Sequence, residues 1–212
     1  MLNENRKQSY MEYPSIEDHI SVFQYQGAKE FANGWFWPEE GEWYKKMCQK
    51  IQNGKIIEIG SWEGLSLSYI KSTIQTNNNK IWSVEINCNK RLAENTEKWG
   101  IELICKSSVD ASLTFPNGFF DLIYIDASHQ YEDVKADILA WMPKLRIGGI
   151  IAGHDYDHFW PGVAKAVNEL IPSRSLEGRN WSFIKLNSIG SDGPRRSVPL
   201  DVMAKDDPFP LF

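Results

Sequence analysis

Cysteine is scarce in this sequence, and the few cysteines are scattered. Cys48, Cys88 and Cys105 are the three that it contains, and no two of them have the CxxC spacing. Without such a pair, a structural zinc site is not expected. An odd and dispersed set favours reduced thiols in a cytosol over a framework of disulfides.

Excess positive charge and long hydrophobic runs are missing too. The net charge of −5 argues against broad electrostatic binding to nucleic acid or to an anionic membrane. No stretch approaches about 18 apolar residues, so no transmembrane helix is expected. The polar first residues do not resemble a signal peptide. We therefore expect a cytoplasmic protein, whose hydrophobic content of 42% suffices for one core.

One stretch combines a strand, a glycine turn and a helix. Residues 55–60 are apolar and β-branched, which is typical of a buried strand. Gly60 to Gly64 is a tight turn, and apolar residues then recur at helical spacing over 65–76. Glu58 lies on the strand, two residues before the first glycine.

This turn lacks the patterns of phosphate-binding loops. Neither G-x-G-x-x-G nor G-x-x-x-x-G-K-[ST] is present. A carboxylate at Glu58 would repel phosphate but attract an ammonium group or ribose hydroxyls. An ordinary βα turn that carries a buried or exposed glutamate is the alternative interpretation.

Strands and helices alternate along the chain from residue 55. Further strands are predicted at 81–86, 101–105, 119–126, 148–153 and 181–186, and helices at 38–51, 90–99, 131–145 and 163–170. This alternation predicts an α/β sandwich with a mostly parallel sheet. Residues 1–50 are expected to form an N-terminal extension, residues 51–187 the main domain and residues 188–212 a tail.

Polar groups follow the predicted strands, where α/β sheets bind ligands. Glu85 ends the second strand, 21 positions beyond Gly64. An acid there accepts hydrogen bonds from ribose hydroxyls in nucleoside-binding folds. A surface glutamate at a strand end is the plainer alternative.

Two later strand ends carry two acids and two histidines. Asp126 and His129 follow one strand, and His154 and Asp155 follow the next. The carboxylates suit Mg²⁺, whereas His154 as a ligand would favour Zn²⁺, Mn²⁺ or Fe²⁺. His129 has the chemistry of a general base. Alternatively, His129 caps the next helix and His154 is a hydrogen-bonded core residue.

Aromatic residues crowd the segment that precedes the first strand. They are Phe23, Tyr25, Phe31, Trp35, Phe36, Trp37, Trp43 and Tyr44. They predict either a lid over a small-molecule site or an extra packing layer on the sheet.

Two segments carry a specific resemblance. Phe120-Asp-Leu-Ile-Tyr-Ile-Asp-Ala-Ser-His and Pro143-Lys-Leu-Arg-Ile-Gly-Gly-Ile-Ile-Ala-Gly-His-Asp-Tyr resemble the class I S-adenosylmethionine-dependent methyltransferases of type 24. That family is similar to macrolide-sugar O-methyltransferases and to cephalosporin-hydroxylase-type proteins. The resemblance covers roughly residues 35–186. It implies a Rossmann-like three-layer sandwich with a seven-stranded, mostly parallel sheet.

The resemblance also implies residues that hold the cofactor. Glu58, Gly60, Ser61 and Gly64 would surround the methionine part of S-adenosylmethionine. Glu85 would hold the ribose, Ser108 would lie near the adenine, and Asp126 would form a wall of the site. Trp62 stands where the usual class I motif has a glycine, although the type 24 family often lacks that glycine, and Ser107 stands where an acid is common.

The same resemblance implies a catalytic and a metal site. His129 matches a catalytic base beside Asp126, and Asp126, His154 and Asp155 lie where relatives bind a metal such as Mg²⁺. His154 stands where relatives often carry an acid, which weakens the case for a metal.

The function expected is O-methylation of a small hydroxylated acceptor, such as a sugar or a catechol-like ring. The alternatives are a metal-dependent hydroxylase or hydrolase that uses His129, His154 and Asp155, and a nucleoside-binding protein without turnover. No nucleic-acid or membrane partner is expected, and a homo-oligomer is left open.

Overall fold

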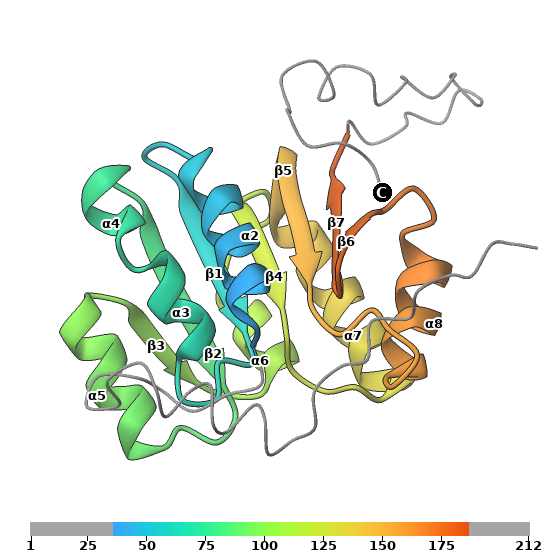
Figure 1. Ribbon diagram of the computed structural model, residues 1–212, viewed down its shortest axis with the longest axis horizontal. Helices are drawn as coiled ribbons and strands as arrows, with labels where there is room; N and C mark the ends of the chain where they lie inside the picture. Colours follow the sequence, from blue (N-terminus) through green and yellow to red (C-terminus); the bar gives the residue numbers. More distant parts are fainter. Residues whose placement is uncertain (1–35, 187–212) are drawn as a thin grey trace, which may run out of the picture.

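The computed structural model describes residues 36–186 and builds them around a seven-stranded sheet (Figure 1). The strand order is β3-β2-β1-β4-β5-β7-β6. The elements in chain order are α2 (Pro38–Gln49), β1 (Lys55–Ile59), α3 (Leu65–Ile70), α4 (Thr73–Thr76), β2 (Lys80–Glu85), α5 (Lys90–Trp99), β3 (Glu102–Cys105), α6 (Ser108–Ser112), β4 (Phe120–Ile125), α7 (Tyr131–Trp141), η1 (Met142–Lys144), β5 (Leu145–Gly153), α8 (Pro161–Leu170), β6 (Ser175–Glu177) and β7 (Asn180–Ile184).

The predicted fold class is confirmed. Strands β1 to β5 pair in parallel, and β7 runs antiparallel to both β5 and β6. The order places β1 and β4 side by side near the centre. Strands β2 and β3 are added on the β1 side, and the strands after β4 are added on the opposite side, so the strand order reverses between β1 and β4. Ligands of such sheets bind beyond the carboxyl ends of these central strands.

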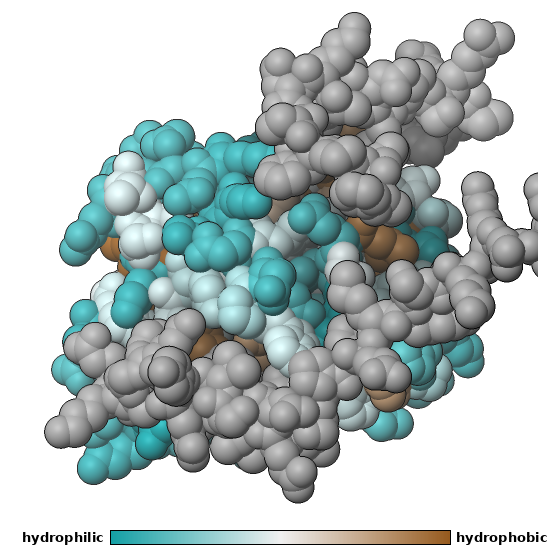
Figure 2. Space-filling model, viewed as in Figure 1, coloured by the Kyte–Doolittle hydropathy of each residue, from teal (hydrophilic) through white to brown (hydrophobic). Residues whose placement is uncertain are grey.

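Helices cover both faces of the sheet, which explains the unbroken apolar runs of the central strands. Side chains alternate between the faces along each strand. Ile56 and Tyr124 pack with α2, α3 and α5 in one core cluster. Ile57 and Ile123 pack with α6, α7 and α8 in the other. In Figure 1, α2 and α3 lie across one face of the strands, and Figure 2 shows a largely hydrophilic surface over them.

Three differences from the sequence prediction are larger than one or two residues at an element end. The helix predicted over 65–76 is two short helices, α3 and α4. Strand β5 begins at Leu145, which had been assigned to the preceding helix because its spacing fits. Pro143 lies in η1 and ends the helical path, so the chain is already extended at Leu145. Strand β6 was not predicted, and its three residues are all exposed.

The aromatic segment is only partly described. Within residues 36–186, Phe36 and Tyr44 are buried in the core on the α2 face, and Tyr44 stacks on Tyr124 at a centroid distance of 4.1 Å. For these two side chains the packing-layer interpretation is correct. The aromatic residues up to Trp35, the lead-in 1–35 and the tail predicted at 188–212 lie outside the described residues. None of the helices in the described range is long and apolar enough to cross a membrane.

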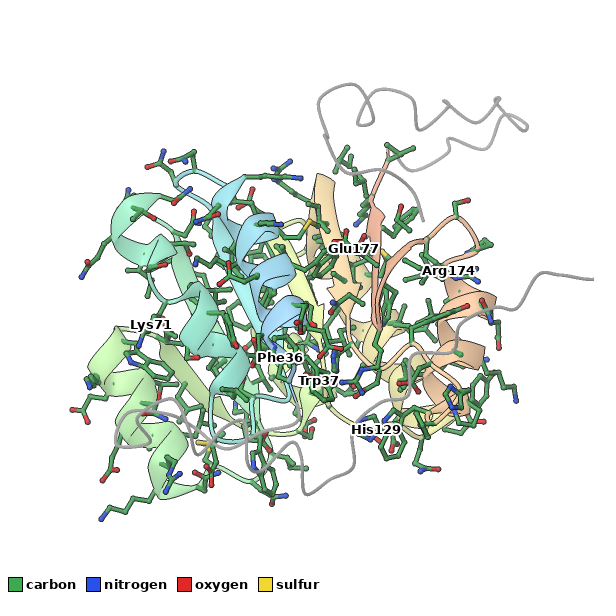
Figure 3. The ribbon with its side chains drawn as sticks, in the orientation of Figure 1. Phe36, Trp37, Lys71, His129, Arg174 and Glu177 are labelled. Atoms are coloured by element: carbon green, nitrogen blue, oxygen red, sulfur yellow. A yellow bond between two sulfur atoms is a disulfide. The ribbon has the colours of Figure 1, made fainter. Side chains whose placement is uncertain are left out.

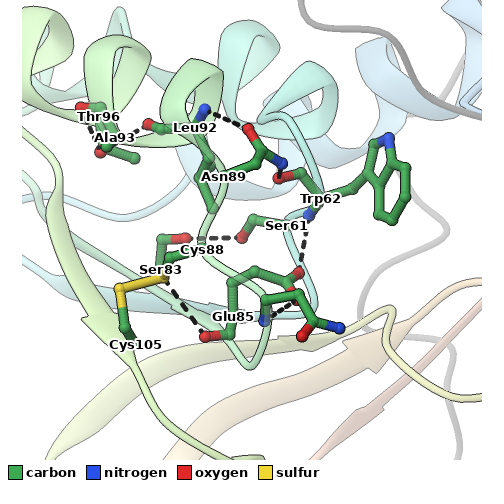
Figure 4. Close-up of a disulfide and its surroundings, with 11 residues drawn as sticks. Ser61, Trp62, Ser83, Glu85, Cys88, Asn89, Leu92, Ala93, Thr96 and Cys105 are labelled. Atoms are coloured by element: carbon green, nitrogen blue, oxygen red, sulfur yellow. Dashed lines mark hydrogen bonds between the residues drawn. A yellow bond between two sulfur atoms is a disulfide. The ribbon is translucent and has the colours of Figure 1, made fainter.

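The prediction of three reduced cysteines is wrong for two of them. Cys88 and Cys105 form a disulfide, while Cys48 is free and buried (Figure 4). Cys105 ends β3, and Cys88 lies in the loop that follows the neighbouring strand β2. Their separation in the sequence is 17 residues, which concealed the proximity that parallel pairing of β2 and β3 creates. The expectation of a cytoplasmic location loses the support it drew from reduced thiols.

We expect the disulfide to stabilise the fold. A crosslink that closes a loop of 17 residues removes chain entropy from the unfolded state, which corresponds to about 3 kcal/mol. The Cys88→Ser, Cys105→Ser variant should lose about this much free energy of unfolding in chemical denaturation. The wild-type protein in dithiothreitol is the control and should match the variant. Equal midpoints for oxidised and reduced wild type would contradict the prediction.

Candidate active site

The carboxyl ends of β1, β2, β4 and β5 meet at one edge of the sheet, as the sequence predicted. Backbone hydrogen bonds join the loops at this edge. The N–H of Gly60 donates to the carbonyl oxygen of Val84 (2.8 Å), and the N–H of Asp126 donates to that of Ile59 (2.8 Å). The N–H of His154 donates to the carbonyl oxygen of Ile125 (3.1 Å). Figure 3 places the labelled Phe36, Trp37 and His129 along this edge. The loops that carry the predicted site residues are therefore fixed to one another.

Gly60 is required by the neighbouring turn. Its φ is +84°, and a Cβ at this position would lie 2.2 Å from the carbonyl oxygen of Asp126. The loops after β1 and β4 can meet only because Gly60 has no side chain. Gly64 (φ +90°) precedes α3 in a left-handed conformation. Trp62 is also left-handed, at φ 49°, a conformation that glycine adopts more readily than other residues.

Glu58 is buried on β1 with one oxygen unpaired. Ser66 Oγ donates to Glu58 Oε1 (2.6 Å), and Oε2 has no hydrogen-bond partner within residues 36–186. Burial, partly offset by the Ser66 bond and reinforced by the charge of Asp126, raises the pKa of Glu58 to about 8. An orphaned carboxyl oxygen in a buried position suits the ammonium group of a methionine-type ligand.

Glu85 joins the two turns expected to hold a nucleoside. Its Oε2 accepts from Trp62 N–H (2.9 Å) and its Oε1 from Asn87 N–H (2.9 Å). Ser83 Oγ donates to Ser61 Oγ (2.8 Å) directly beneath this turn (Figure 4). Each carboxylate oxygen of Glu85 keeps a second lone pair, so it can still accept a ribose hydroxyl.

The two serines that follow β3 form hydrogen bonds with other residues of the protein. Ser107 caps α6 by accepting from Asp110 N–H (3.2 Å). Ser108 Oγ accepts from the indole Nε1 of Trp141 (2.9 Å), which turns its hydroxyl towards α7. The role of Ser108 beside an adenine stays a prediction.

His129 is held by a carboxylate and an aromatic ring. Its Nε2 lies 2.7 Å from Asp155 Oδ2, and Trp160 stacks on it at a centroid distance of 3.9 Å. A small pocket lies here, with Asp126, Ser128, His129, His154 and Asp155 among its lining residues. Bonding to His129 and His154 outweighs burial and holds the pKa of Asp155 well below its usual range. Burial raises the pKa of Asp126 to about 6, although the charge of His154 opposes this.

His154 is almost fully buried between carboxylates. Its Nε2 lies 2.8 Å from Glu40 Oε2, and its Nδ1 lies 3.2 Å from Asp155 Oδ1 and 3.8 Å from Asp126 Oδ1. Burial alone would lower the pKa of His154, but the charge of Asp126 and the contacts with Asp155 and Glu40 raise it to about 10. The surrounding carboxylates therefore favour the protonated form of the His154 ring.

Two members of this site, Glu40 and Arg179, were missed by sequence reasoning. Arg179 Nε donates to Glu40 Oε1 (2.8 Å), and Arg179 Nη1 lies 3.3 Å from Asp155 Oδ1. Glu40 lies in the first turn of α2, where an acid is common because it favours the helix dipole. Arg179 precedes β7, and only the antiparallel direction of β7 brings that end of the strand to the edge where β5 ends.

The predicted metal ligands converge, but their donor atoms are engaged. Ligand atoms of Asp126, His154 and Asp155 lie within 4.8 Å of one another. However, both ring nitrogens of His154 face carboxylates, and both oxygens of Asp155 contact nitrogen atoms of His129, His154 or Arg179. The donor set in this arrangement does not fit a divalent cation.

Comparison with known families agrees with this geometry. Residues 57–156 match the model of the type 24 family, described as a methyltransferase domain. The chain carries a methyltransferase domain of the class I, S-adenosylmethionine-dependent type. The matched span of this domain includes Glu58, Glu85, Asp126, His129 and Asp155. Glu40 and Arg179 lie outside it.

The domain has relatives in sequence and in structure. Protein R132 of Acanthamoeba polyphaga mimivirus, described as uncharacterised, is 31% identical over 150 residues, which span 63% of this chain and 66% of that protein. A protein from Corynebacterium glutamicum has a similar structure (TM-score 0.61, 18% identity, 81% of this chain and 89% of that one). So does an O-methyltransferase from Bacillus cereus in complex with SAH (TM-score 0.56, 16% identity, 82% and 94%).

A further similar structure is that of CalS11, a TDP-rhamnose 3'-O-methyltransferase of calicheamicin biosynthesis. Its TM-score is 0.54 at 15% identity, over 71% of this chain and 78% of that one. Similarity at this level of identity shows a shared fold.

We expect binding of S-adenosylmethionine to release a proton from Glu58. With a pKa of about 8, Glu58 is mostly protonated at neutral pH. A cationic ammonium beside it lowers this pKa, so affinity should rise between about pH 6 and about pH 8. Calorimetry in two buffers of different ionisation enthalpy should show release of nearly one proton at pH 7.

The Glu58→Gln variant should bind the cofactor without this proton release. Glu63→Gln, an acid in the same turn, is the matched control and should behave as the wild type. Undiminished proton release in Glu58→Gln would show that another group is responsible.

Proposed function

We propose that this protein transfers the methyl group of S-adenosylmethionine to a hydroxyl oxygen of a small acceptor. The observation that carries this proposal is the position of His129, bonded to Asp155 and stacked on Trp160, at the same sheet edge as the glycine turn. A held base beside a cofactor turn is what an O-methyltransferase needs.

His129 would act as the base through Nδ1. Its Nε2–H donates to Asp155 Oδ2, which fixes the tautomer and leaves the lone pair on Nδ1. Stacking on Trp160 limits rotation of the ring. The protein then has to align the acceptor oxygen behind the methyl group and remove its proton.

The cofactor supplies an electrophilic methyl on a sulfonium. In the reaction, a carbon–oxygen bond forms on the acceptor as the carbon–sulfur bond breaks, and the acceptor proton passes to His129. The products are a methyl ether, S-adenosylhomocysteine and, after release, a proton. Glu58, Gly60, Ser61, Gly64 and Glu85 would bind and orient the cofactor.

The acceptor is proposed to be a sugar or a catechol-like ring. The structural likeness to an enzyme named for a sugar hydroxyl supports the first class. The rival interpretation, a metal-dependent hydroxylase or hydrolase, requires His154 as a ligand, and its ring nitrogens are engaged with Glu40 and Asp155. A panel of nucleotide sugars and catechols, assayed for S-adenosylhomocysteine, tests the proposal. Confirmed cofactor binding with no product across the panel would contradict it.

We expect Glu85→Ala to weaken S-adenosylmethionine binding by roughly tenfold. The variant loses charged acceptors for the ribose hydroxyls, and hydrogen bonds to charged groups contribute about 1.5–3 kcal/mol. Glu102→Ala removes an exposed acid from the adjacent strand β3 and is the control for the charge change. An unchanged dissociation constant for Glu85→Ala in calorimetry would refute ribose binding by this residue.

We expect His129→Asn to lower kcat by about 10²–10⁴-fold because the base is lost. Cofactor affinity should not change, since the ring lies on the acceptor side. His158→Asn, a change of an exposed histidine in the loop after β5, is the control and should keep full activity. Single-turnover assays that show similar rates for His129→Asn and wild type would exclude His129 as the base.

A further inference from the structure

Arg179 ties together the acids at the acceptor edge. Besides its bond to Glu40 Oε1, its Nη2 donates to Glu40 Oε2 (3.2 Å), and its Nη1 lies 3.3 Å from Asp155 Oδ1 and 3.6 Å from Asp157 Oδ2. The guanidinium is mostly buried, with a side-chain exposure of 13%. A planar cation in this setting satisfies several carboxylates at once.

Glu40 contacts both Arg179 and His154. Its Oε2 lies near His154 Nε2 and accepts from the backbone N–H of Trp37 (2.8 Å), while its Oε1 accepts from Arg179. Because Glu40 sits in the first turn of α2 and Arg179 just before β7, the cluster joins the two ends of the described chain across the sheet. Phe36 covers His154 at a centroid distance of 4.9 Å, which keeps this cluster dry.

The carboxylates that could bind a metal are thus already matched by nitrogen atoms. Asp155 Oδ1 faces Arg179 and His154, and Asp155 Oδ2 faces His129. In the described region, the only charged contact of Asp126 is the one to His154 Nδ1, at 3.8 Å. A divalent cation would find at most one free carboxylate, and it would lie beside the positive guanidinium of Arg179.

We propose that the Arg179 guanidinium and the His154 ring, both in contact with Glu40 and Asp155, occupy the place that a divalent metal would take, so that this methyltransferase works without one. The proposal rests on the O-methyltransferase function proposed above. Arg179 and His154 fix Asp155 through its Oδ1, so that Oδ2 of Asp155 faces His129. Deprotonation of the acceptor then depends on the His129–Asp155 pair.

Titration with Mn²⁺, followed by electron paramagnetic resonance of the free ion, tests this proposal on the intact protein with S-adenosylhomocysteine bound. The wild type should show no binding tighter than about 1 mM. Methyl transfer, once an acceptor is known, should be the same in EDTA and in Mg²⁺. Binding of one Mn²⁺ with a dissociation constant below about 0.1 mM that is lost in Asp126→Asn would overturn the proposal.

Replacing either His154 or Arg179 should create affinity for a metal ion. His154→Asp replaces the ring with a carboxylate and should tighten Mn²⁺ binding at least about tenfold, while His158→Asp makes the same substitution at an exposed position and should not. Arg179→Gln is a second variant in case His154→Asp does not fold, and it too should gain affinity, which a merely structural role would not produce. If neither folded variant gains Mn²⁺ binding, His154 and Arg179 are not the residues that exclude the metal.

Cofactor calorimetry on the same samples separates the two proposals. Absence of S-adenosylhomocysteine binding contradicts the proposed function. Tight binding of both S-adenosylhomocysteine and Mn²⁺ by the wild type contradicts only the metal-free site.

Discussion

The arrangement of this site depends on placing several carboxylates close together in a buried position. Glu40, Asp126 and Asp155 converge where charges are poorly screened, and such a group is stable only if each charge is paired or protonated. Arg179 and His154 supply the pairing, and the raised pKa of Asp126 shows that its own compensation is weaker. The position of His129 follows from this cluster, because Asp155 offers it the oxygen that faces away from Arg179.

The second constraint is steric and links the cofactor side to the acceptor side. Gly60 touches the backbone of the loop after β4, so the turn that would hold the methionine part and the loop that carries Asp126 and His129 cannot move independently. The disulfide has a comparable effect on the nucleoside side. It joins the loop after Glu85 to the end of β3, just before Ser107, which caps α6. Both halves of the site are therefore positioned by contacts within the fold.

Local patterns were sufficient for most elements of the fold. Helix α5 has the predicted bounds, and β1 and β2 differ from the prediction by one residue at an end, because apolar β-branched runs and a glycine after the helix are strong short-range signals. Helical spacing misled at Leu145, where Pro143 had already ended the helix. The prediction of reduced cysteines failed because the pairing of Cys88 with Cys105 depends on which strands are neighbours in the sheet. The spacing of the two cysteines in the sequence does not indicate that β2 and β3 are neighbours.

The sequence by itself determined the α/β class, the glycine turn and the set of acids and histidines at strand ends, since parallel strands bring their carboxyl ends to one edge. Only the tertiary structure decided how those groups are paired. Glu40 and Arg179 reach the edge from α2 and from the antiparallel strand β7, and no local pattern marks either one. The contacts of His154 with Glu40 and of Asp155 with Arg179 follow from these two residues, because they depend on distances between segments far apart in the chain.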